Sequence, residues 1–203
     1  MTVSQQPPLL LACSPRQGGN CDAVMDVVRD TLRSLEPSVP QVTFLRNHTI
    51  SPCVSCGHCA LQRLGCPRAE RDDSGPLFAA FCRAPALVLV APIYFYHLPA
   101  QFKALIDRSQ PWWMLRDVWS ETPPSRKPAH AILLGARPQG ERLFEGALLS
   151  LRYWLDLFGY DLAEPLTLYG LDGPDAFRGN AAHREQVARY AAGVGSALAS
   201  RED

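Results

Sequence analysis

Short apolar runs alternate with longer amphipathic stretches along the whole chain. The runs are continuously apolar, which is typical of strands buried on both faces of a parallel sheet. Because strands and helical stretches alternate, the pattern predicts βαβ units with right-handed crossovers, and therefore a doubly wound α/β sheet. The five expected strands are Leu9–Cys13, Val42–Leu45, Ala86–Pro92, Ala131–Gly135 and Leu166–Tyr169.

Apolar residues that recur every three or four positions predict the helices between these strands. The first helix begins at about Asn20 and ends before Pro37, since proline cannot continue a helix. Gly159 occupies the position that typically closes a helix. The other expected helices are Pro76–Cys82, Leu98–Arg108, Glu141–Phe158 and Ala181–Ala199.

The alternation breaks between residues 46 and 75, over a stretch longer than an ordinary loop. Four of the seven cysteines lie in this stretch, between Cys53 and Cys66. A chain of 203 residues is suited to one large core. We therefore expect a single domain over residues 1–203, with a cysteine-rich insertion at about 46–75.

Charge and composition restrict the partners. Lys and Arg together number 20, as do Asp and Glu, so a nucleic-acid-binding surface is not expected. The chain has no apolar run near the roughly 18 residues of a membrane span, and Leu9–Cys13 is too short for a signal segment. These features predict a cytoplasmic protein without a membrane partner, whose cysteines are reactive or ligand thiols.

The first strand runs into the turn Ser14-Pro15-Arg16-Gln17-Gly18-Gly19 and then directly into a helix at Asn20. This arrangement places a hydroxyl, a guanidinium and free backbone N–H groups at the positive end of a helix. Two successive glycines let the backbone approach a ligand closely. The loop lacks the Lys-Ser/Thr of a P-loop and the Gly-x-Gly-x-x-Gly dinucleotide turn, and it predicts a phosphate site of another type.

Three motifs together resemble the NAD(P)H-dependent FMN reductases and, within them, the iron–sulfur flavoproteins. The first is the 14–20 loop, and the second is the segment from Cys53 that ends in Asp72-Asp73. The third is Pro92-Ile93-Tyr94 followed by Pro99-x-x-Phe102-Lys103-x-x-x-Asp107-Arg108. The resemblance implies a flavodoxin-like fold with a five-stranded parallel sheet of order 2-1-3-4-5, and FMN as cofactor. The crevice of such a sheet lies at the carboxyl ends of strands one and three.

The resemblance also implies which residues bind FMN. The phosphate would be held by Ser14, Arg16, Gly19 and Asn20 of the first motif, and Gly18 and Cys21 of the same motif are also expected to be cofactor-binding residues. Cys21 stands where the family usually has Thr or Ser, so one hydroxyl donor is missing. The isoalloxazine would be lined by Pro92, Ile93, Tyr94 and Phe95. Gly135-Ala136-Arg137, after the expected fourth strand, would supply a third wall, with Gly135 and Ala136 as cofactor-binding residues. No catalytic side chain is implied, because the flavin carries the chemistry.

Cys53, Cys56 and Cys59 are spaced three apart, and Cys66 follows with Pro67 behind it. This segment resembles the cluster motif of the iron–sulfur flavoproteins, in which four thiolates would hold a [4Fe–4S] cluster. A zinc site with four thiolates, a redox-active pair and free thiols are the alternatives.

Two functions follow. The first is an NAD(P)H-dependent FMN reductase, in which a nicotinamide gives hydride to the flavin and a small molecule or protein accepts the electrons. The alternative is an electron carrier that relays electrons between FMN and a [4Fe–4S] cluster. A flavin-free binding module fits the three motifs poorly.

A non-periodic apolar segment at Trp112, Trp113, Met114 and Trp119 predicts a homodimer or homotetramer that buries it, unless it packs onto its own chain.

Overall fold

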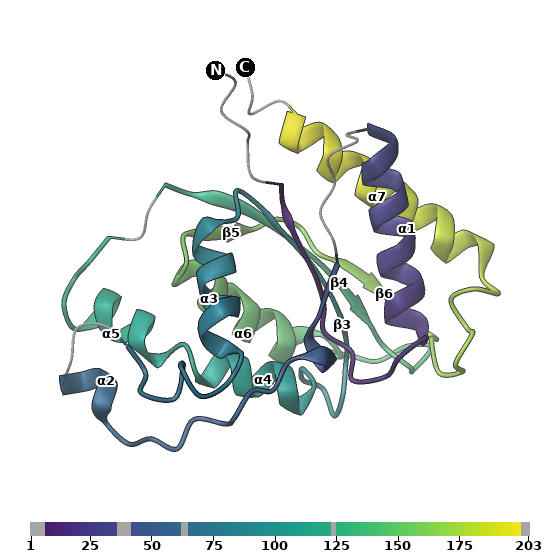
Figure 1. Ribbon diagram of the computed structural model, residues 1–203. Coiled ribbons are helices and arrows are strands. Elements are labelled where there is room, and N and C mark those ends of the chain that lie inside the picture. Colours follow the sequence, from purple (N-terminus) through teal and green to yellow (C-terminus); the bar gives the residue numbers. More distant parts are fainter. Residues whose placement is uncertain (1–6, 36–41, 62–64, 123–124, 200–203) are drawn as a thin grey trace.

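A parallel sheet lies between two layers of helices in the computed structural model, which describes residues 7–35, 42–61, 65–122 and 125–199. The strands follow the order β2-β1-β3-β4-β5, so the predicted doubly wound topology is confirmed (Figure 1). The strands are β1 Leu9–Ala12, β2 Val42–Phe44, β3 Leu87–Pro92, β4 Lys127–Leu134, β5 Tyr160–Leu162 and β6 Leu166–Leu168.

Two short strands, β5 and β6, lie one after the other along β4 and form the edge of the sheet. Ala129 of β4 is in register with Leu162 of β5, and Ile132 of β4 is in register with Leu166 of β6. Pro165 lies between the two strands and has no N–H to donate to a ladder. The predicted fifth strand corresponds to β6, whereas β5 was not expected.

The helices cover both faces of the sheet. Those of eight or more residues are α1 Asn20–Leu35, α3 Ser74–Arg83, α4 Ala100–Asp107, α5 Gln110–Asp117, α6 Glu145–Asp156 and α7 Ala181–Ala199. The short elements are η1 Leu45–Asn47, a 3₁₀ turn, and α2 His58–Leu61. Gly159 follows α6 with a φ of +76°, which confirms its predicted role in ending that helix.

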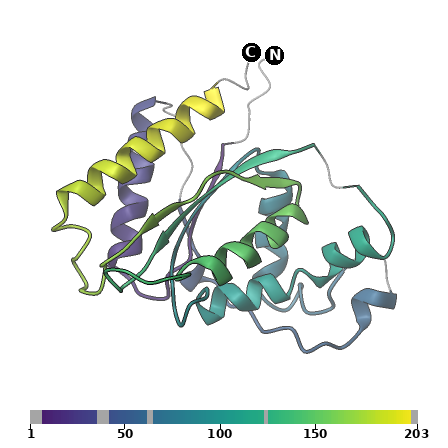
Figure 2. The same cartoon turned by 180° about the vertical axis from the view of Figure 1, so that it is seen from behind.

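Successive residues of β3 supply the two halves of the core. Leu87, Leu89 and Ala91 pack toward α3, α4 and α6, whereas Val88 and Val90 pack toward α1 and α7. Figures 1 and 2 show these two helical layers on opposite sides of the sheet. The layer with α3, α4 and α6 is rich in aromatic rings, and the other layer is mostly aliphatic.

Trp112, Trp113 and Met114 lie in the helix α5, which the sequence did not predict, and Trp119 follows that helix. The Trp112 ring lies 4.3 Å from the Phe78 ring and 5.3 Å from the Phe158 ring, measured between centroids. These contacts attach α5 to its own chain. Trp113 remains 42% exposed.

In the described part of the chain, no helix combines the length and the apolar composition needed to cross a bilayer.

Candidate functional site

A cleft lies where β1, β3 and β4 end, and loops from four parts of the chain form its walls. Most of the predicted cofactor residues line it, namely Ser14, Arg16, Gly19, Asn20, Cys21, Pro92, Ile93, Tyr94 and Ala136. Gly18, Phe95 and Gly135 stand beside the cleft without lining it. Leu134, Leu171 and Asp172 also line it, although the sequence did not indicate them.

The loop after β1 is held by its own side chains. Ser14 Oγ accepts the Arg16 N–H at 3.1 Å, and the Gly18 N–H donates to Asp22 Oδ2 at 2.7 Å. Gly18 has a φ of +70°, a conformation that favours glycine. A Cβ on Gly19 would lie 2.9 Å from Arg16 Cδ, so glycine allows Arg16 to fold over the loop. The Gly18 N–H is therefore engaged inside the protein, whereas the first N–H groups of α1 have no intrahelical partner.

Asn20 fastens a distant loop to the start of α1. Its Nδ2 donates to the carbonyls of Leu171 at 3.2 Å and Gly173 at 2.8 Å. Its Oδ1 accepts the Phe177 N–H at 3.0 Å. The side chain of Asn20 thus holds the wall that carries Leu171.

Cys21 brings a buried thiol to the cleft. Burial raises the pKa of Cys21 to about 12, and the neighbouring Asp22 carboxylate adds to the rise. A thiol with this pKa is protonated at neutral pH, so it contributes no negative charge to a site for an anion.

The loop after β3 makes a tight turn with aromatic residues at its tip. Tyr94 and His97 exchange two backbone hydrogen bonds of 2.8 and 3.0 Å, and Phe95 and Tyr96 between them have φ values of 50° and 63°. Such left-handed values are costly for bulky residues. Phe95 is fully exposed. His97 Nε2 lies 2.9 Å from Ser150 Oγ on α6, which supports the turn from below.

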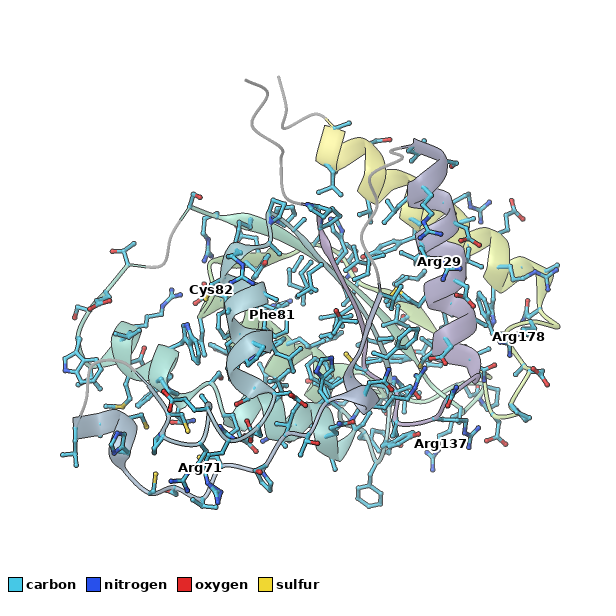
Figure 3. All side chains as sticks on the ribbon, viewed as in Figure 1. Arg29, Arg71, Phe81, Cys82, Arg137 and Arg178 are labelled. Carbon is cyan, nitrogen blue, oxygen red and sulfur yellow. The ribbon has the colours of Figure 1, made fainter. Side chains whose placement is uncertain are left out.

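The loop after β4 is held close to its neighbours. The Gly135 N–H donates to Leu168 O, and Gly135 O accepts the Leu171 N–H. A Cβ on Gly135 would lie 2.7 Å from Leu143 Cδ2, so this glycine permits close packing behind the cleft. Arg137, which is labelled in Figure 3, donates from Nη1 to Tyr96 Oη at 2.8 Å, and this contact joins the loop after β4 to the loop after β3.

Residues 9–159 match the sequence profile described as NADPH-dependent FMN reductase. The chain belongs to this family. It is also 32% identical over 96 residues to an iron–sulfur flavoprotein of Methanosarcina thermophila, which is 47% of this chain and 48% of that protein. The chain therefore spans about half the length of the curated relatives it matches.

Solved structures of flavodoxin-like proteins resemble this reductase-family chain in fold. An azoreductase from Bacillus anthracis str. Sterne has a TM-score of 0.68 and 14% identity, covering 92% of this chain and 99% of that one. An NAD(P)H:quinone oxidoreductase from Methanothermobacter marburgensis has a TM-score of 0.62 and 16% identity, covering 96% of this chain and 100% of that one. These likenesses confirm the predicted flavodoxin-like fold.

The four cysteines of the predicted cluster motif share one surface segment. Cys53 and Cys56 are exposed, and Cys59 and Cys66 are half-buried. Burial raises the pKa of Cys59, a backbone hydrogen bond partly opposes this, and the other three thiols raise it further. Within the described ranges, no three His, Cys, Asp or Glu side chains are grouped closely enough to hold a metal ion. The thiols are therefore near one another without forming a ready metal site.

The two ends of this cysteine segment are joined at its base. The Thr49 N–H donates to Asp73 Oδ2 at 2.7 Å, and the Asp73 N–H donates to Thr49 O at 2.9 Å. Asp72 Oδ2 accepts the Ser51 N–H at 3.0 Å. Arg108, at the end of α4, donates to the Ser51 carbonyl and pairs with Asp72. In this family member, Asp72 and Arg108 thus hold the cysteine segment rather than line the cleft.

Proposed function

We propose that this protein is an FMN-binding oxidoreductase that takes hydride from NADH or NADPH and passes electrons to a small-molecule or protein acceptor. The cleft carries this proposal. It places Arg16 and the N-terminus of α1 beside the apolar ends of β3 and β4. FMN joins a phosphate to an aromatic ring system, and these two surfaces match its two ends. Membership of the FMN reductase family supports the same cofactor.

The phosphate end of the site would use backbone and side-chain donors together. The first N–H groups of α1 would donate to the phosphate at the N-terminus of the helix, where the helix dipole is positive. Arg16 adds a forked pair of donors, which suits a phosphate. Ser14 Oγ lies at the same wall. The protonated Cys21 thiol does not repel the anion.

The other end of the cleft would hold the flavin ring. When bound, FMN supplies the chemistry of hydride acceptance and electron transfer. Pro92, Ile93 and Tyr94 would orient the ring against the end of β3, and Phe95 at the tip of the turn would cover its outer face. Asp172 offers a carboxylate that can accept hydrogen bonds from the hydroxyls of the ribityl chain.

Titration of the apoprotein with FMN tests this proposal. Arg16→Ala removes a charge-assisted hydrogen bond, so FMN affinity is expected to fall about 10- to 150-fold. Arg33→Ala, in the last turn of the same helix, is the matched control and is expected to leave affinity unchanged. The holoprotein is expected to oxidise NADH or NADPH. A protein that takes up no FMN, or an Arg16→Ala variant with wild-type affinity, contradicts the assignment.

A second candidate function is the relay of electrons between FMN and a [4Fe–4S] cluster. Two observations favour it. The four cysteines lie on one segment whose flanking residues, Thr49 and Asp73, are hydrogen-bonded to each other. The chain is also similar to the iron–sulfur flavoprotein of Methanosarcina thermophila. Anaerobic purification with iron and flavin measured on the same sample tests it. About four irons per chain, lost in Cys56→Ser, supports the relay. Iron-free protein that oxidises NAD(P)H rapidly supports the reductase alone.

We also propose that the protein forms a homodimer or homotetramer. Trp113 on α5 and Leu149 and Tyr153 on α6 are 42%, 57% and 71% exposed. Large apolar side chains that stay exposed on a single chain often mark an interface. Light scattering at micromolar concentration tests the proposal, and a monomeric mass contradicts it.

A further inference from the structure

Two oppositely charged side chains lie behind the loop that follows β1. Asp22 is in the first turn of α1 and is buried. Arg46 comes from η1, directly after β2. Because Ala12 of β1 is in register with Phe44 of β2, the segment after β2 emerges beside the loop after β1. Arg46 Nη1 donates to Asp22 Oδ1 at 2.8 Å and to Arg16 O at 3.4 Å.

Asp22 gives the loop its shape. Its second carboxylate oxygen accepts the Gly18 N–H at 2.7 Å, where the chain turns through a positive φ. This contact engages the Gly18 N–H within the loop, and the next residue, Gly19, lines the cleft. A carboxylate in this position also carries a negative charge at the end of α1 where the phosphate of FMN would bind. Two like charges in one site repel each other.

Arg46 offsets that charge from the side away from the ligand. Its guanidinium lies 4.3 Å from the centre of the Phe44 ring and is mostly buried. In the described part of the chain, the residues that line the cleft do not include Arg46. Its side chain therefore acts on Asp22 and on the Arg16 backbone rather than on a ligand.

We propose that Arg46 is a positioning residue that neutralises Asp22, so that the loop keeps its shape and still accepts a doubly charged phosphate. This inference rests on the proposed binding of FMN. It makes the pair a determinant of selectivity for phosphorylated flavin. Riboflavin has the same ring but no phosphate, so the negative charge of Asp22 does not repel it.

The test compares the affinities of the apoprotein for FMN and riboflavin in four proteins: wild type, Arg46→Met, Asp22→Asn and the double variant. Methionine keeps an apolar stem against Phe44 and removes the charge. Arg46→Met is expected to weaken FMN binding about 10- to 100-fold and to change riboflavin binding less than about threefold. Asparagine still accepts the Gly18 N–H but is neutral. The double variant is therefore expected to recover FMN affinity to within about threefold of wild type.

Arg29→Met is the matched control. Arg29 lies on α1, the helix that carries Asp22, but further from the loop (Figure 3). It pairs with Asp26 at 3.1 Å. This variant is expected to bind both flavins as the wild type does. Arg46→Gln, which is neutral and can still donate to Asp22, serves the same comparison if Arg46→Met does not fold.

The outcomes separate two failures. If the wild-type protein binds FMN no more tightly than riboflavin, the proposed phosphate site is wrong, and this inference fails with it. Wild-type protein that prefers FMN while the neutral Arg46 variants keep that preference overturns this inference alone. A double variant that binds FMN as weakly as Arg46→Met also overturns it, because the loss would then not come from the exposed charge of Asp22.

Discussion

Arg108 Nη1 lies 2.6 Å from Asp72 Oδ2, and both side chains are almost completely removed from solvent. The same guanidinium donates to Ser51 O and to Ser74 Oγ, each at 2.9 Å. Asp72 also accepts hydrogen bonds from Ser51 and Ser74. The ion pair therefore connects the end of α4 with the start of α3. It also holds the chain just before Cys53, the first cysteine of the motif. The protein thus anchors an exposed segment to its interior by a charged contact.

Breaking this pair is expected to be costly. Removal of one partner leaves the other charge buried without compensation, and such losses are typically about 3–5 kcal/mol. Asp72→Asn is expected to lower the free energy of unfolding by about 3 kcal/mol in urea titrations. Arg189→Ala, which breaks the exposed pair with Glu185, is the control and is expected to cost less than about 0.5 kcal/mol. Equal effects of the two substitutions would contradict this account.

The contribution of Asp72 is expected to depend on pH in a defined direction. Burial alone would raise the pKa of Asp72, but hydrogen bonds from Ser74, Arg108 and Ser51 outweigh it and hold that pKa well below its usual range. The unfolded state therefore binds more protons at acid pH, and the stabilisation is lost as pH falls below about 4. The difference in unfolding free energy between wild type and Asp72→Asn is expected to narrow there. A difference that stays constant from pH 7 to pH 3 would argue against an ionised Asp72.

The buried thiols are expected to resist alkylation. Burial raises the pKa of Cys13 well above its usual value and that of Cys21 to about 12, whereas Cys53, Cys56 and Cys82 are exposed. Because the thiolate is the nucleophile, iodoacetamide at pH 8 is expected to label the exposed cysteines of iron-free protein first. Peptide mapping by mass spectrometry would show this. Early labelling of Cys21 in the folded protein would contradict it, and labelling of all thiols in urea is the control.

The aromatic turn after β3 is expected to lower the stability of the apoprotein and to contribute to FMN binding. Phe95 and Tyr96 occupy left-handed conformations that cost roughly 1 kcal/mol or more per residue. Phe95→Asn with Tyr96→Gly supplies the residues such a turn favours, so the melting temperature of the apoprotein is expected to rise while FMN affinity falls. Ser120→Gly, at another positive φ, is the control and is expected to stabilise without affecting FMN. A double variant that binds FMN as the wild type does would mean that the strain has no part in binding.

Much of the fold could be predicted from the sequence because the inner strands are buried on both faces. Leu87 to Ala91 in β3 are all fully buried, and a run of this kind leaves little choice of structure. The outer strand was harder to predict. β5 has only three residues, and its first residue, Tyr160, comes directly after the glycine that ends the preceding helical segment, so it has no pattern of its own.

The parts of the site that were missed depend on contacts distant in the sequence. Leu171 and Asp172 reach the cleft because Asn20 binds their loop, and 151 residues separate Asn20 from Leu171. The helical form of α5 likewise accompanies the packing of Trp112 on Phe78 and Phe158. By contrast, the turn at Ser14 to Asn20 could be predicted because its glycines and its polar groups follow one another along the chain. Its internal hydrogen bonds, such as that of Gly18 with Asp22, were not visible in the motif.

The uneven distribution of aromatic rings across the sheet has a consequence for experiments. The sequence contains four tryptophans, at positions 112, 113, 119 and 154, and all of them lie in or just after α5 and in α6. Tryptophan fluorescence therefore reports on one side of the molecule, whereas circular dichroism reports on the helices of both. If α1 and α7 were to separate from the sheet first during unfolding, the ellipticity would fall before the emission shifted, so the two signals together would show which side opens first.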